Sequence, residues 1–141
     1  MNKDELIAKF DLQPLEGEGG LYSTIYRDEL SNAIYFMVVS PDFSAWHRLP
    51  QAELWLHLSG DPLLLHTIEN GQLVSNRLEQ EGQSPHYQVP ANTWMAAETL
   101  GSYSLVSCFL APAFSTMELI GRDELLSQFP NIANLPELFH E

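Results

Sequence analysis

Segment 44–60 (SAWHRLPQAELWLHLSG) holds the side chains whose types and spacing could do chemistry. His47 precedes Glu53 by six residues, and Trp55 and His57 follow at alternate positions. Because alternate side chains of a strand share one face, an imidazole, a carboxylate and an indole should project together, with leucines on the opposite face. A histidine beside a carboxylate in an apolar hollow can serve as a near-neutral base. The segment therefore predicts a cavity site with His47 and Glu53 as its candidate catalytic or anchoring groups.

Short β-like runs flank this segment on both sides. They cover residues 21–27, 31–39, 62–69, 72–78, 87–89, 93–97 and 103–111, with Gly, Pro or Asn between them. The dipeptide Asn70-Gly71 between two such runs is a strong hairpin signal. Short helices are expected at 2–10, where Asn2 can cap the first turn, and at 121–129. The pattern predicts an all-β sandwich or barrel with a short helix near each end.

Domain organisation follows from length and apolar content. We expect one domain over residues 1–141, with a core at about 12–119 and a C-terminal helix and tail at 121–141. Leu135, Leu138 and Phe139 indicate that the tail packs on the body. The run 31–39 is apolar on both faces, which is typical of a packed sandwich or a subunit contact, and we therefore expect a homodimer.

Charge and cysteine usage restrict the partners and the compartment. The chain has 19 acidic and 6 basic residues, a formal net charge of -13, which disfavours nucleic acid and anionic membranes as partners. No apolar run approaches the ~20 residues of a membrane span, and the acidic N-terminal segment does not resemble a signal peptide. Cys108 is the single cysteine and lies in an apolar run, so we expect a structural thiol in a reducing, cytoplasmic setting.

The spacing of His47, Leu49, Glu53 and Gly60 resembles the second half of the first cupin motif, G-x5-H-x-H-x3/4-E-x6-G. Residues 90–95 (PANTWM) fall on the second motif, P-x-G-x2-H. The frame is kept, but Leu49, Asn92 and Met95 stand where the motifs have His, Gly and His.

A closer resemblance is to a group of small single-domain cupins akin to the sugar-nucleotide epimerase of rhamnose synthesis. It covers about residues 12–119 and rests on seven phrases in order: EGG at 18–20, IY at 34–35, SAWHR at 44–48, ELW at 53–55, GDPL at 60–63, VPANTW at 89–94, and LVSC with APAF at 105–114. The group usually has an Arg-Glu pair where Ser23 and Thr24 stand here. The resemblance implies a double-stranded β-helix, or jelly roll, that commonly forms dimers.

The resemblance also bears on metal binding. A cupin metal site typically needs three His and one Glu, and here Leu49 and Met95 occupy two of those positions. Leu cannot bind a metal, and a thioether is a poor ligand for a hard divalent ion. His47 and Glu53 remain, with His57 as a third candidate donor. We expect no standard metal site and no cofactor; a divalent metal such as Zn, held by these three donors, is the less favoured alternative.

Three functions stay open at this point. The favoured one is a protein that binds a small organic, carbohydrate-like ligand through His47, Glu53, Trp55, His57 and Met95. The second is a metal-independent epimerase or isomerase that uses His47 and Glu53, although a sugar nucleotide would favour more cations than Arg27 and Arg48 near the matched segments. The third is a vestigial pocket in which His and Glu form a structural polar cluster.

Overall fold

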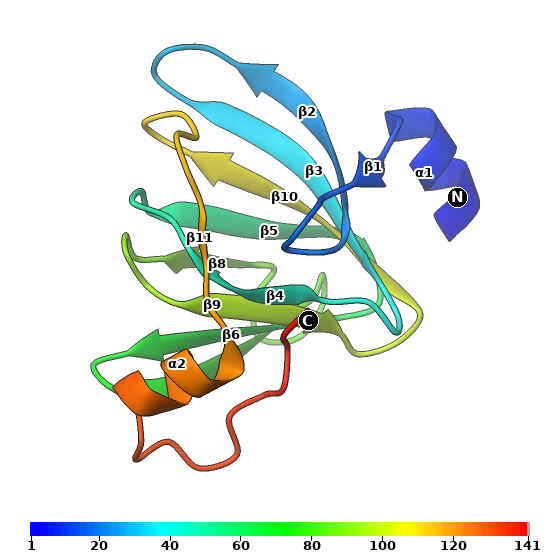
Figure 1. Cartoon of the computed structure of the whole chain (residues 1–141). Coiled ribbons are helices and arrows are strands. Elements are labelled where there is room, and N and C mark those ends of the chain that lie inside the picture. Colours follow the sequence, from blue (N-terminus) through cyan, green and yellow to red (C-terminus); the bar gives the residue numbers. More distant parts are fainter. Residues whose placement is uncertain (141) are drawn as a thin grey trace.

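Two antiparallel sheets packed face to face form the body of the protein (Figure 1). The computed structural model describes residues 1–140. The six-stranded sheet has the order β1 (Gln13–Pro14), β2 (Leu21–Arg27), β3 (Asn32–Val39), β10 (Tyr103–Leu110), β5 (Glu53–Gly60), β8 (His86–Val89). The five-stranded sheet has the order β11 (Glu118–Leu119), β4 (Ser44–Arg48), β9 (Met95–Thr99), β6 (Leu63–Glu69), β7 (Gln72–Leu78). The predicted all-β jelly roll is confirmed.

Local sequence signals account for the turns and for the direction of side chains. Asn70 and Gly71 both have positive φ, at 54° and 74°, and join β6 to β7 as the hairpin signal predicts. Along β5 the side chains of Glu53, Trp55 and His57 are buried, whereas Leu56 and Leu58 are exposed. The predicted alternation is therefore correct. It directs the polar and aromatic groups of β5 into the space between the sheets.

Helix α1 (Lys3–Phe10) covers part of the outer face of the six-stranded sheet. Asn2 caps it, because the Asn2 side chain accepts from the Glu5 backbone N–H and the Glu5 carboxylate accepts from the Asn2 N–H. Leu6 of the helix packs in one cluster with Met37 of β3, which is fully buried. The two-sided apolar character of β3 thus has an explanation within one chain, and the homodimer stays a prediction.

The C-terminal segment covers the outer face of the five-stranded sheet. Leu125 of α2 (Arg122–Gln128) and Leu138 of the tail share a buried cluster with Trp46 and Trp94. The Trp46 indole N–H donates to the Pro136 carbonyl at 2.9 Å, and the Trp46 backbone N–H donates to the Leu138 carbonyl at 3.1 Å. The predicted packing of the tail is confirmed, and it supports β4, the strand that carries His47.

In the described part of the chain neither helix is long and apolar enough to cross a membrane.

Candidate functional site

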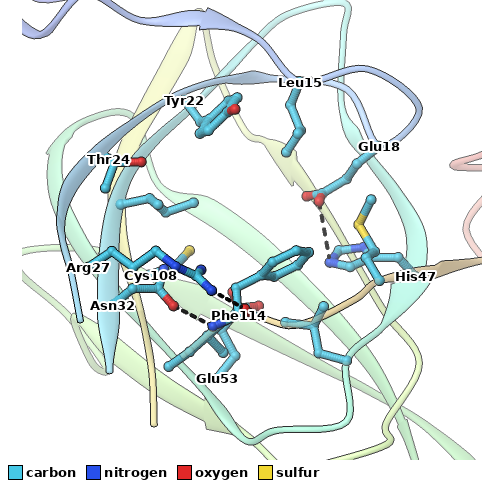
Figure 2. A pocket seen from close by; sticks show the side chains of 14 residues that line it. Leu15, Glu18, Tyr22, Thr24, Arg27, Asn32, His47, Glu53, Cys108 and Phe114 are labelled. Carbon is cyan, nitrogen blue, oxygen red and sulfur yellow. Dashed lines mark hydrogen bonds and ion pairs between the residues drawn. The ribbon is translucent and has the colours of Figure 1, made fainter. Parts of the chain in front are cut away.

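A cavity of about 270 Å³ opens between the two sheets (Figure 2). Strands β2, β3, β4, β5 and β10 contribute side chains to it, together with a loop before β2 and the segment that follows β10. The lining residues are Leu15, Glu18, Tyr22, Thr24, Arg27, Asn32, Ile34, His47, Leu49, Glu53, Cys108, Leu110, Phe114 and Met117. Apolar side chains make up much of the wall, and a few polar groups point into it.

Glu18 reaches the cavity from a glycine-rich loop. Gly17, Gly19 and Gly20 all have positive φ, which allows the loop to fold back over the barrel. At Gly20 an added Cβ would lie 2.6 Å from the Phe36 ring, so this position also lacks room for a side chain. The Glu18 carboxylate is buried and accepts a 2.6 Å hydrogen bond from the Ser44 hydroxyl.

His47 is held on β4 in a defined orientation. Its Nδ1 lies 2.7 Å from the Ala45 carbonyl, and since a carbonyl only accepts, Nδ1 carries the proton. Nε2 therefore faces the cavity, 3.7 Å from a Glu18 carboxylate oxygen (Figure 2). The ring is 2% exposed. In this tautomer Nε2 offers a lone pair to a bound molecule.

Glu53 occupies a different electrostatic environment. It is buried, and this desolvation together with the negative charge of Glu18 raises its pKa from 4.5 to about 8. The Trp55 indole N–H donates to the carboxyl oxygen at 2.9 Å and opposes the shift in part. At neutral pH Glu53 is therefore mainly a carboxylic acid that can donate a hydrogen bond.

The cavity wall also contains the thiol of Cys108, which is unreactive. Burial, followed by the charges of Glu53 and Glu18, raises the pKa of Cys108 well above its usual range. The thiolate is the reactive form of cysteine, so Cys108 acts as a small apolar wall residue, in line with the structural role expected from the sequence.

The exposed members of the lining are Thr24 and Arg27 of β2 and Phe114 of the segment after β10, and they mark the mouth of the cavity. The Arg27 guanidinium reaches across from β2 and donates from Nη2 to the Phe114 carbonyl at 2.7 Å (Figure 2). The Phe114 backbone N–H donates to the Asn32 amide oxygen at 2.6 Å. Gln51 donates to the Ala113 carbonyl at 2.9 Å. Three side chains thus fix this segment beside the opening.

Comparison with known proteins identifies the family. The sequence model described as cupin superfamily (DUF985) matches residues 4–119. The chain belongs to the cupin superfamily. Among curated proteins, no significant match is found.

Solved structures agree with this membership. A Shewanella oneidensis protein is 28% identical, with a TM-score of 0.86 over 92% of this cupin and 91% of that chain. A Leishmania major hypothetical protein is 24% identical, with a TM-score of 0.81 over 92% and 93%. A Klebsiella pneumoniae protein with a double-stranded β-helix domain is 15% identical, with a TM-score of 0.62 over 82% and 95%. At these lower sequence identities, the last two comparisons support only a shared fold.

The donor set of this cupin does not fit the metal site typical of the superfamily. Leu49 presents an apolar side chain to the cavity, and Met95 is buried in the main core cluster. Of the four motif positions, only His47 and Glu53 carry groups that can bind a metal ion. Within residues 1–140 no three His, Cys, Asp or Glu side chains gather closely enough to hold a metal ion.

The structure brings two of the five predicted ligand-binding residues to the cavity wall, His47 and Glu53. Trp55 lies in the core behind Glu53, in edge-to-face contact with Phe36, and acts on the site through its hydrogen bond to Glu53. His57 is buried at another part of β5, where its Nε2 is 2.8 Å from the Asp61 carbonyl. Trp55, His57 and Met95 are thus not among the residues that line this cavity.

Sequence reasoning missed two charged residues of the site. Glu18 stands in the EGG phrase, which the sequence offers only as a mark of the family resemblance; an acid between glycines is the available signal, and the structure shows it buried. Arg27 enters the sequence-based prediction only as a cation for a sugar nucleotide. Arg48 is not among the residues that line the cavity; it pairs with Glu118 at 2.7 Å and stacks on Trp94.

Proposed function

We propose that the barrel cavity binds a small organic molecule, which His47 Nε2 and the protonated Glu53 contact directly. The observation that carries this proposal is the projection of these two groups into one largely apolar cavity. The volume of about 270 Å³ is just below the range of drug-sized ligand pockets, about 300 to 1,000 Å³, so the ligand must be small. A compact molecule with hydroxyl or carbonyl oxygens, such as a carbohydrate-like compound, suits this combination of an apolar wall and few polar points.

A second candidate function is metal-independent proton transfer of the isomerase or lyase type. The different environments of His47 and Glu53 favour it, because they supply a base and a neutral acid in the same cavity. His47 Nε2 would take a proton from a carbon next to a carbonyl group. Glu53 would give its proton to the carbonyl oxygen, so that an enol forms and the charges balance. Any such turnover should fall by a factor of about 10² or more in His47→Asn or Glu53→Gln.

The binding proposal is tested by blocking the cavity. Thr24 lines it and Ile25, its neighbour on β2, is exposed and is not among the lining residues, so Thr24→Trp and Ile25→Trp form a matched pair. A library of small hydroxy and keto compounds should contain members that raise the unfolding temperature of wild type and Ile25→Trp saturably. Thr24→Trp should lose that response. Equal stabilisation of both variants by every hit would contradict binding in this cavity.

A further inference from the structure

We infer that the ligand of this cavity is a small organic acid whose carboxylate binds Arg27 at the mouth, while a carbonyl or hydroxyl oxygen of the same molecule reaches Glu53. This inference rests on the proposed function and adds the charge and orientation of the ligand.

The pairing of the arginines is the first observation. The sequence has only four arginines, compared with 19 acidic residues. Arg48 pairs with Glu118, Arg77 with Glu79, and Arg122 with Glu137. For Arg27 the structure gives no ion pair over residues 1–140, and its hydrogen bond goes to the Phe114 carbonyl. Among the arginines, the one at the cavity is thus the one for which residues 1–140 supply no carboxylate partner.

The second observation is that one hydrogen bond positions the Arg27 guanidinium and leaves its other N–H donors available. Its bond to Phe114 engages Nη2, and a guanidinium carries five N–H donors in a fixed planar fork. Phe114 is itself fixed by Asn32 at 2.6 Å, so the group that positions Arg27 is anchored to β3. A planar fork with free donors matches a carboxylate, which can accept two parallel hydrogen bonds.

The charges on the other cavity groups decide between an anionic and a cationic ligand. Glu18 is engaged by the Ser44 hydroxyl and lies beside His47, and burial keeps Glu53 protonated at neutral pH. The one negative charge that this wall presents, on Glu18, lies beside His47 and already accepts from Ser44, whereas the positive charge of the wall is on Arg27. An anion would find the Arg27 fork at the mouth and, further in, an acid that donates a hydrogen bond to oxygen.

The test uses a ladder of keto acids of increasing length: pyruvate, 4-oxopentanoate, 5-oxohexanoate and 6-oxoheptanoate. Each is compared with its primary amide, which has nearly the same shape without the charge. Binding to the full-length protein is measured by calorimetry at pH 7. Arg27→Gln keeps a donor for the Phe114 carbonyl, and Arg48→Gln is the matched control, because Arg48 is ion-paired and lies outside the cavity lining.

At least one acid should bind wild type and Arg48→Gln roughly tenfold or more tighter than its amide. In Arg27→Gln the affinity for that acid should fall by about the same factor, and the preference over the amide should vanish. If amides bind as well as acids, or if Arg27→Gln keeps the preference, the inference is wrong and the cavity-binding proposal stands. If neither acids nor amides bind at millimolar concentration, and the compound library also gives no saturable stabilisation, both proposals fail.

Discussion

Glu53→Gln should be more stable than wild type at pH 8 by several kcal/mol and about equal to it near pH 4.5. The folded protein holds the Glu53 proton up to about pH 8, whereas the unfolded chain releases it near the ordinary value of 4.5. Between these values unfolding releases a proton, so rising pH favours the unfolded state. The wild-type free energy of unfolding should fall by up to about 1.4 kcal/mol per pH unit, on the order of 5 kcal/mol in total.

Urea unfolding of both proteins at half-unit steps from pH 4.5 to 8.5 measures this difference. Gln at position 53 can still accept the Trp55 indole N–H, so packing and the hydrogen bond are retained. Glu118→Gln is the control, because Glu118 is exposed and should change only the surface pair with Arg48. Parallel curves for wild type and Glu53→Gln would show that Glu53 is ionised in the folded protein.

Trp46→Ala should destabilise the protein by about 3–5 kcal/mol and release the C-terminal tail. The Trp46 side chain is fully buried between the five-stranded sheet and the tail, and its indole N–H donates to the Pro136 carbonyl. Truncation leaves a cavity under Leu135 and Leu138 and removes that bond. Because Trp46 precedes His47 on β4, loss of the tail should also loosen the imidazole.

Chemical denaturation gives the free energy, and limited chymotrypsin digestion monitors the tail. In Trp46→Ala, cleavage after Leu138 and Phe139 should become much faster than in wild type. Trp46→Phe keeps most of the apolar contact and loses only the hydrogen bond, so its loss should be smaller, about 1–2 kcal/mol. A tail that is cut no faster in Trp46→Ala than in wild type would contradict this role.

Periodicity and capping signals predicted much of the fold. The alternation along β5, the Asn2 cap and the Asn70-Gly71 hairpin are local, and each is found where the sequence indicates. The two-sided apolar character of β3 was ambiguous, because a subunit and a helix of the same chain can cover such a face equally well. Only the tertiary structure shows that α1 covers part of it.

The candidate site was predicted in part, for a geometric reason. The alternation of side chains along a strand predicts the face on which each one lies, but not its position along the barrel. Glu53 and His57 share a face, yet four residues separate them by about 13 Å along β5. Glu18 comes from the loop before β2, and Arg27 comes from β2 itself. The spacing within segment 44–60 therefore could not predict that they join His47 at one cavity.

The family motifs and the structure together explain the absence of the usual donor set. Leu49 and Met95 replace two histidines of the cupin motifs, and both side chains are buried among apolar groups. What remains at this end of the barrel is an imidazole with a free Nε2 and a carboxyl group kept from ionising. These two groups can bind an oxygen-bearing molecule or move protons on it.

The protonation state of Glu53 inside the cavity is the central claim, and infrared difference spectroscopy measures it directly. The spectrum of wild type minus Glu53→Gln at pH 6.5 should contain the C=O stretch of a protonated carboxyl group, which disappears as the pH is raised through about 8. If the difference spectrum at pH 6.5 instead shows the paired bands of a carboxylate, Glu53 is ionised and the account of this cavity as a neutral acid beside a base is wrong.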